Sequence, residues 1–171
     1  MQIVEASVRE ATYIALLARF TFTETFGHYF KDKTDLENYL QQTFNVKKLR
    51  NSLTKPNNIF WLAYIDDLPV GYGKLKLNSP SHFITDKNVC QLQKIYVLKD
   101  FLSKKVGLAL QTKILERAVS SPAQKIWLSV LKSNERAIQF YKKNGFETIG
   151  DHNFQIGQEH FKFQAMAKNL R

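Results

Sequence analysis

Cysteine is nearly absent from this 171-residue chain. Cys90 has no partner for an internal disulfide and sits in a strand-like run, so we expect a small buried side chain without redox or nucleophilic chemistry. Long apolar stretches are absent too, because no run approaches the roughly 18 residues that a membrane span needs. The N-terminus also lacks the basic and then apolar layout of a signal peptide. We therefore expect a cytoplasmic protein that makes no contact with a membrane.

Acidic residues are few. Against 25 Lys and Arg stand 15 Asp and Glu, which gives a formal net charge of +10. Such an excess attracts nucleic acid, an acidic membrane or a polyanionic cofactor. The basic residues are scattered, however, with no block of like charge, no zinc-finger spacing and no RNA-binding aromatic signature. Nucleic acid is thus not the partner we expect, although a non-catalytic, basic nucleic-acid-binding domain remains an alternative.

Metal-ligand patterns are missing as well. His82, His152 and His160 show no spacing typical of a metal site, so we expect no metal. Internal repeats, low-complexity tracts and linkers are also lacking. The composition, 44% hydrophobic and 23% charged, is ordinary for a soluble globular protein. We expect one domain over residues 1–171, large enough to bury a core.

What the sequence does contain is a regular alternation of strand-like and helical patterns. Ser7 and Glu10 predict a capping box at the start of the first helix, and Gly145 predicts the end of the last helix. Apolar residues at every fourth position from Val106 to Ala118 indicate an amphipathic helix. Helices are expected at residues 7–26, 33–43, 46–55, 104–120 and 134–143. Strands are expected at residues 2–6, 58–65, 70–77, 89–98, 125–131, 146–156 and 161–167.

The most informative segment joins the strand at residues 89–98 to the helix at residues 104–120. Unpaired backbone N–H groups and the positive end of the dipole at a helix N-terminus favour an anion. Lys104 and Lys105 add two positive charges there, and Gly107 lets the backbone come close to a ligand. The pattern predicts a phosphate-binding turn, with a solvated pair of surface lysines as the plainer interpretation.

A second segment carries Asn134, Tyr141 and a closing Gly145. It predicts a short helix that projects a tyrosine toward the same crevice. Two plainer roles remain open: Tyr141 could pack its ring on the sheet, and Asn134 could be only a helix cap. Together the two segments are typical of a site for an acyl-coenzyme A.

The order of elements and both motifs resemble the Gcn5-related N-acetyltransferase (GNAT) superfamily over essentially the whole chain. Its pyrophosphate-binding pattern is Gln or Arg, two variable residues, Gly, one variable residue, and Gly or Ala. The matching residues here are Lys104, Lys105, Val106, Gly107, Leu108 and Ala109. Lys104 replaces the usual first residue; it is still a cation, although it is less suited to a bidentate contact.

Four segments resemble the PaiA-type bacterial spermidine/spermine N-acetyltransferases more closely, namely residues 23–27, 93–97, 126–128 and 134–146. The resemblance implies an α/β (α+β) GNAT fold, with a mixed central sheet of about seven strands flanked by helices in the order β-α-α-β-β-β-α-β-α-β-β. It also implies an acyl-CoA-dependent N-acetyltransferase that uses acetyl-CoA as co-substrate.

Residue roles follow from the same resemblance. Backbone groups of Ile95, Tyr96 and Val97 are expected to hold and polarise the thioester carbonyl. Tyr141 matches the general acid that protonates the departing thiolate. Asn134 matches a position that contacts the cofactor.

The general base is less defined. Glu24 and His28 lie near the end of the first long helix, which borders the acceptor site in this superfamily. Either residue could take a proton through water, and Glu24 could instead bind an ammonium group. A solvated helix face is the plainer interpretation of both. Glu24 is the residue that we expect to be catalytic.

The expected acceptor is the primary amine of a small molecule, with spermidine or spermine as the leading candidate. The segment after Gly157 weakens that choice, because it has aromatic residues and Lys162 where a polycation would prefer carboxylates. A protein N-terminus or a lysine side chain is the alternative acceptor. Members of the superfamily often pair, so a homodimer is a further expectation.

Overall fold

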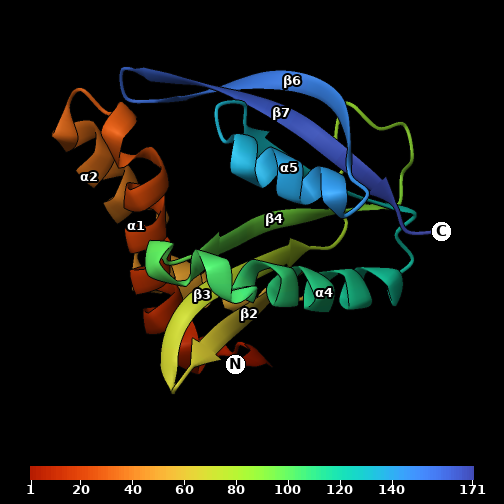
Figure 1. Cartoon of the computed structure of the whole chain (residues 1–171), viewed down its shortest axis with the longest axis horizontal. Helices are drawn as coiled ribbons and strands as arrows, with labels where there is room; N and C mark the ends of the chain where they lie inside the picture. Colours follow the sequence, from red (N-terminus) through yellow and green to blue (C-terminus); the bar gives the residue numbers. More distant parts are fainter.

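The computed structural model describes all residues from 1 to 171, and its centre is a seven-stranded sheet with helices on both faces (Figure 1). The strands are β1 (Gln2–Glu5), β2 (Asn58–Ile65), β3 (Leu68–Lys76), β4 (Val89–Val97), β5 (Lys125–Leu131), β6 (Glu147–Ile156) and β7 (Glu159–Asn169). The helices are α1 (Ala11–Phe26), α2 (Lys33–Thr43), α3 (Val46–Leu53), α4 (Val106–Val119) and α5 (Glu135–Lys143). Short 3-10 turns, η1 (Val8–Glu10), η2 (Gly27–Tyr29) and η3 (Lys99–Lys104), join them. The expected mixed α/β fold with seven strands is confirmed.

The strand order is β1-β2-β3-β4-β5-β7-β6, and every neighbouring pair except β4 and β5 is antiparallel. The parallel pairing of β4 with β5 covers only Val89 with Lys125, Cys90 with Ile126 and Gln91 with Trp127. Beyond that point the two strands diverge. Main-chain groups of β4 that would have met β5 therefore have no strand beside them, which matters for the site described below.

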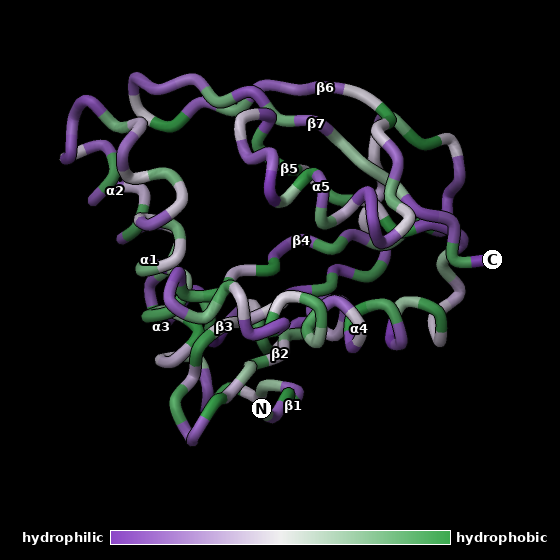
Figure 2. Tube along the Cα trace, viewed as in Figure 1, coloured by the Kyte–Doolittle hydropathy of each residue, from purple (hydrophilic) through white to green (hydrophobic).

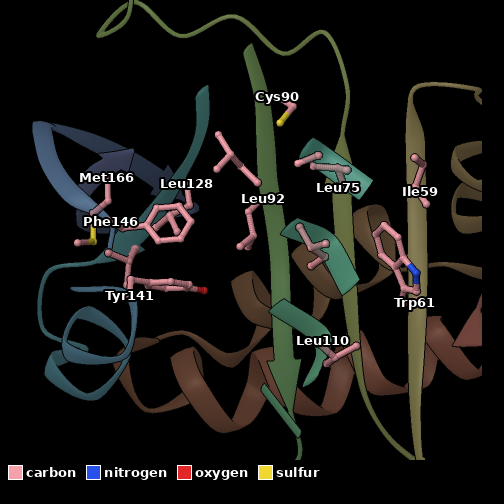
Figure 3. Packing of buried hydrophobic residues seen from close by; sticks show 14 of the residues in the cluster. Ile59, Trp61, Leu75, Cys90, Leu92, Leu110, Leu128, Tyr141, Phe146 and Met166 are labelled. Atoms are coloured by element: carbon pink, nitrogen blue, oxygen red, sulfur yellow. The ribbon is translucent and has the colours of Figure 1, made fainter. Parts of the chain in front are cut away.

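Two hydrophobic clusters hold the layers together. One lies between the sheet and the helices α4 and α5, and Figure 3 shows part of it around Leu92, Leu128 and Tyr141. The other packs α1, α2 and α3 against the opposite face of the sheet. The edge strand β6 is mostly hydrophilic (Figure 2), as expected for a strand with one free edge.

The α4 stripe shows how the pattern produces the packing. Val106, Leu110, Ile114 and Ala118 are all fully buried, as their four-residue spacing predicts. Opposite them, Gly73 of β3 lets the helix come close, because a Cβ atom there would lie 2.9 Å from Ile114 Cδ1. The helix that leads into the candidate site is thus fixed to the centre of the sheet.

Two local signals in the sequence are confirmed, and the turn between β2 and β3 is a further local feature. Ser7 and Glu10 form a complete capping box, although it opens the η1 turn that leads into α1. Gly145 follows α5 with a φ of 82°, in the region that favours glycine. Asp66 and Asp67 have φ values of 48° and 61°, which is the geometry of a two-residue hairpin turn between β2 and β3.

Several boundaries differ from the expected ones. The helix expected at residues 104–120 begins only at Val106, because residues 99–104 form η3 and Lys105 is left-handed with a φ of 60°. Strand β3 starts at Leu68 instead of residue 70, because the turn needs only two residues. None of the helices combines the length and the apolar character needed to cross a membrane.

Cys90 lies in the first cluster and is completely buried. Its burial raises the pKa of the thiol to about 12, so it remains a thiol at neutral pH. The expectation of a structural cysteine is confirmed.

Candidate functional site

The divergence of β4 from β5 is flanked by two cavities. The first has a volume of about 830 Å³ and lies between the end of β4, the start of α4 and α5. The second has a volume of about 950 Å³ and lies on the face of β3 and β4 that α1 and α3 cover. Tyr96 is the residue that lines both, so it stands at their junction.

The start of α4 forms the floor of the first cavity. The first amide to bond within the helix is that of Ala109, which donates to the Lys105 carbonyl at 3.1 Å. The amides of Val106, Gly107 and Leu108 precede it and have no partner within the helix. No atom lies within 4 Å of the place where a Cβ of Gly107 would stand, so a ligand can reach this backbone. These free amides and the adjacent space fit a diphosphate group.

The structure divides the six residues expected in this turn. Lys105, Gly107 and Leu108 line the cavity, whereas Lys104 and Ala109 do not. Val106 is fully buried beneath the turn, so only its amide is available to a ligand. Lys104 closes η3 and is exposed, which fits the surface interpretation better than the phosphate-binding one.

Two cations on α5 line the first cavity and were not expected from the sequence. Arg136 and Lys143 on α5 both line it, and they lie seven residues apart, which places them on one face of that helix. With Lys99 and Lys105 they bring four positive charges around one opening. The seven-residue spacing was visible in the sequence, but nothing there showed that this face of α5 meets the start of α4.

A β-bulge in β4 decides which way its side chains point. Lys74 pairs with Lys94 and Leu75 pairs with Leu92, so Gln93 is an extra residue. The bulge reverses the alternation of side chains after it. For this reason Ile95 packs against the cluster under α4, like Leu92 before the bulge, although the two positions differ in parity.

The three residues expected to hold the thioester, Ile95, Tyr96 and Val97, all line the first cavity. On one side they pair with β3, and on the other they lie past the last residue of β4 that pairs with β5. Their main-chain groups on that side are therefore free to hydrogen-bond a ligand. The side chain of Tyr96 points toward the opposite face, where its ring stacks on Tyr72 with 5.9 Å between centroids.

Tyr141 of α5 is buried and serves the packing as well as the cavity. Its ring lies 5.2 Å from that of Phe140 and 5.6 Å from that of Phe146, measured between centroids. Its hydroxyl points toward β4 across the gap (Figure 3). Burial raises the pKa of Tyr141, so the hydroxyl stays protonated at neutral pH and can donate. The pKa of Tyr96 is also raised, first by burial and then by the nearby Tyr141.

Asn134 and Glu24 line the first cavity and also have structural roles. Asn134 caps α5, because its Oδ1 accepts from the Ala137 amide at 3.1 Å. Both interpretations of Asn134 are thus compatible, since its amide nitrogen is not used by the cap.

Glu24 Oε2 accepts from the Lys99 amide at 3.1 Å, which ties the end of α1 to the start of η3. His28 lines the cavity beside Tyr29, with 4.0 Å between ring centroids.

The second cavity has a different character. Its 28 lining residues include no aspartate or glutamate. Five are lysines, namely Lys48, Lys55, Lys74, Lys76 and Lys94. Phenylalanine and tyrosine make up much of the remainder, namely Phe22, Phe26, Tyr39, Phe44, Phe60, Tyr72, Tyr96, Phe154, Phe161 and Phe163. Sequence reasoning did not identify this cavity, because its lysines come from separate elements.

Comparison with known proteins supports the same assignment. The family model described as acetyltransferase (GNAT) family matches residues 16–146. An uncharacterised N-acetyltransferase in the pepI 3′ region of Lactobacillus delbrueckii subsp. lactis is 28% identical, over 93% of this chain and 91% of that protein. An uncharacterised N-acetyltransferase of Mycobacterium bovis is 28% identical, over 79% of this chain and 82% of that protein.

The fold is also similar to a PaiA N-acetyltransferase from Thermoplasma acidophilum, whose structure holds coenzyme A. The TM-score is 0.75 at 19% identity, and the match covers 98% of each chain. This likeness concerns the fold, whereas the family model spans most of the chain and both motifs. The chain belongs to the acetyltransferase (GNAT) family and is an acyl-CoA-dependent N-acetyltransferase.

Proposed function

We propose that the protein transfers the acetyl group of acetyl-CoA to the primary amine of a small molecule, at the point where β4 diverges from β5. The observation that carries the proposal is the Tyr141 hydroxyl, which is buried, protonated and directed at the free main chain of β4. The amides that open α4 lie in the same cavity. A proton donor, a carbonyl-binding backbone and an anion-binding turn are the parts that acyl transfer from a thioester requires.

Each part has a defined task. The amides of Val106, Gly107 and Leu108 bind the diphosphate, and Lys105, Arg136 and Lys143 supply positive charge beside it. Asn134 offers its amide nitrogen to the same ligand.

The chemistry takes place along β4. Main-chain groups of Ile95, Tyr96 and Val97 polarise the thioester carbonyl while the neutral amine attacks it. A C–N bond forms and the C–S bond breaks. Tyr141 donates its proton to the departing sulfur and regains one from solvent. Glu24 takes up the proton that the amine loses, directly or through water, with Oε1, which makes no other hydrogen bond.

The acceptor expected from the resemblance is spermidine or spermine. The likeness to the PaiA N-acetyltransferase supports that choice at the level of the fold. The second cavity does not support it, because a polycation would meet five lysines and no carboxylate there. A protein N-terminus or lysine is the alternative acceptor.

A homodimer also stays a prediction. Tyr13, Leu16 and Phe20 lie on one face of α1 and are 48%, 51% and 62% exposed. They form an apolar stripe that a second copy of the chain would cover.

Two measurements test the proposed activity. A thermal shift with acetyl-CoA and with an oligonucleotide separates an enzyme from a nucleic-acid-binding domain. Acetyl-CoA at a hundredfold excess over its dissociation constant stabilises the protein by ~2.7 kcal/mol, whereas nucleic-acid affinity would collapse with salt. Thiol release over a panel of amines and peptides then measures turnover. The proposal fails if acetyl-CoA gives no shift and no amine or peptide releases thiol.

A further inference from the structure

Lys74 on β3 and Lys94 on β4 lie directly opposite one another in the sheet. Both are half-buried and both line the second cavity. Like charges directly opposite on neighbouring strands destabilise a sheet. Such a pair is costly unless something of opposite charge lies between the two ammonium groups.

No carboxylate of the chain supplies that charge. The three ion pairs of the molecule involve Lys113, Lys125 and Lys132 instead. Lys74 Nζ donates only to the hydroxyl of Ser52 at 3.3 Å. Lys94 Nζ lies 5.8 Å from the centroid of the Phe44 ring and makes no hydrogen bond.

The surroundings make both ammonium groups stronger acids, because burial and neighbouring positive charges favour the neutral amine. The pKa of Lys74 falls to about 8, first through burial and then through the charges of Lys94, Lys76 and Lys55. The pKa of Lys94 falls to about 8 through burial. A bound anion would stabilise the charged form of both lysines and so oppose these shifts. The cavity therefore has a strong electrostatic preference for a negatively charged occupant.

The walls of the second cavity determine what the remainder of the ligand can be. Lys74 Nζ lies 5.0 Å from the centroid of the Phe60 ring, and the Tyr72 and Tyr96 rings stack beside the lysine pair. The volume of about 950 Å³ is suited to a small molecule. An acceptor with an apolar or aromatic portion and one anionic group fits these walls.

We propose that the acceptor amine carries an anionic group, a carboxylate or a phosphate. Lys74 and Lys94 bind this group, while the amine reaches past Tyr96 into the first cavity, where acyl transfer takes place. This inference rests on the proposed function and narrows its substrate class. The ion pairs hold the acceptor on the far side of β4 from the start of α4. Tyr96, at the junction of both cavities, contacts the acceptor between its anionic group and its amine.

The same charges assist the reaction. A positive field favours the neutral form of an amine, so it lowers the pKa of the acceptor ammonium and increases the fraction able to attack. An acceptor with no anionic group would gain no ion pair and would still meet the repulsion. Polyamines are therefore the acceptors that this cavity disfavours most.

Calorimetric titration of the CoA-saturated protein tests the inference with matched probes. Tyrosine is compared with tyramine, glucosamine 6-phosphate with glucosamine, and spermidine serves as the polycation. We expect at least one anionic member to bind more than about tenfold tighter than its neutral-group partner, because its contacts with Lys74 and Lys94 are charge-assisted. Whichever pair shows the preference identifies carboxylate or phosphate as the group bound.

The double variant Lys74→Met and Lys94→Met should lose that preference, while its thermal shift with acetyl-CoA is unchanged. Methionine preserves the length of the side chain. The variant should also fold well, because it loses two like charges that face each other across the sheet. Lys113→Met, at an exposed site on α4, is the matched control and should bind like the wild type. The same amines are then assayed for thiol release.

The inference is overturned if neither anionic probe binds more tightly than its neutral-group partner, if spermidine binds as tightly as the anionic probes, or if no probe binds. Turnover of those neutral-group amines would leave the proposed acetyl transfer intact. Failure of acetyl-CoA to stabilise the protein would remove both.

Discussion

Glu24 on α1 and Lys99, the first residue of η3, are joined by a hydrogen bond of 3.1 Å from the Lys99 amide to Glu24 Oε2. The bond connects the end of a long helix to the turn that leads from β4 to α4. It occupies one carboxylate oxygen of Glu24 and leaves the other free at the first cavity. Glu24 is thus both a structural contact and the best-placed carboxylate for a general base.

Glu24→Gln separates these two roles. Glutamine can still accept from the Lys99 amide, so we expect the melting temperature to be unchanged. We expect kcat to fall at neutral pH and to recover at alkaline pH, where the acceptor amine is already neutral. A pH–rate profile for the variant and the wild type measures this. Profiles that coincide would leave Glu24 with the structural role alone.

Tyr141→Phe should lower kcat by about 10²–10⁴, the usual contribution of a general acid. The hydroxyl makes no hydrogen bond within the chain, and the packing against Phe140 and Phe146 would persist, so acetyl-CoA should bind as before. Steady-state kinetics and a binding isotherm check both points. Tyr13→Phe, on the exposed face of α1, is the control. A weakened binding isotherm with normal kcat would contradict the assignment.

Gly107→Val should produce the opposite pattern. The space beside Gly107 is open, since a Cβ there would have no side chain or neighbouring element within 4 Å, so the fold should tolerate the substitution. It would project into the space that the diphosphate needs. We expect the thermal shift with acetyl-CoA to be lost, whereas Thr112→Val, on the exposed side of α4, should retain it. An undiminished shift in Gly107→Val would exclude this turn as the diphosphate site.

Lys94→Met should change how stability depends on pH. The pKa of Lys94 is about 8 in the folded protein against 10.5 for an ordinary lysine, so between these values the unfolded chain binds more protons. Stability therefore rises as pH increases from about 8 to 10.5, and below pH 8 the buried charge destabilises the fold. The variant escapes this cost. We expect it to be more stable by about 1–2 kcal/mol at pH 7, after allowance for partial exposure.

Denaturant unfolding at pH 7 and at pH 10, without ligand, measures this difference. The advantage of Lys94→Met should shrink at the higher pH. An advantage that is equal at both pH values would show that the surroundings do not lower the pKa of Lys94.

Leu16→Glu tests the apolar stripe on α1. Leu16 is 51% exposed, so the substitution should not affect folding of the monomer. If two copies pair through this face, light scattering should show a dimer for the wild type and a monomer for the variant. A wild-type monomer at all concentrations, or a dimer that survives the substitution, would exclude pairing through α1.

The sequence predicted the parts of the fold that depend on neighbouring residues. The α4 stripe, the Ser7 cap and the stop at Gly145 each depend on residues within a few positions, so their patterns are legible. The turn at the start of α4 was predicted for the same reason, and its binding of phosphate stays a prediction. Lys104 and Ala109 do not line the cavity; for Lys104 the reason is that η3 continues through it and shifts the start of α4.

The remainder depends on contacts that no local pattern contains. The lysines looked scattered along the chain, yet α3, β3 and β4 bring Lys48, Lys74 and Lys94 around one cavity. The approach of Arg136 to the start of α4 depends on how α5 packs. The early end of the β4–β5 pairing creates the free backbone at the site, and it follows from the geometry of the whole sheet.

Gln93, the extra residue of the bulge in β4, affects the orientation of every side chain that follows it in the strand. Without it, Lys94 and Tyr96 would share the α4 side with Leu92, and an ammonium group would be driven into the hydrocarbon interior. Ile95 and Val97 would instead face the second cavity. One inserted residue thus determines which face of β4 carries the cationic side chains and which carries the apolar ones, and with them the chemistry of the cavity on each side.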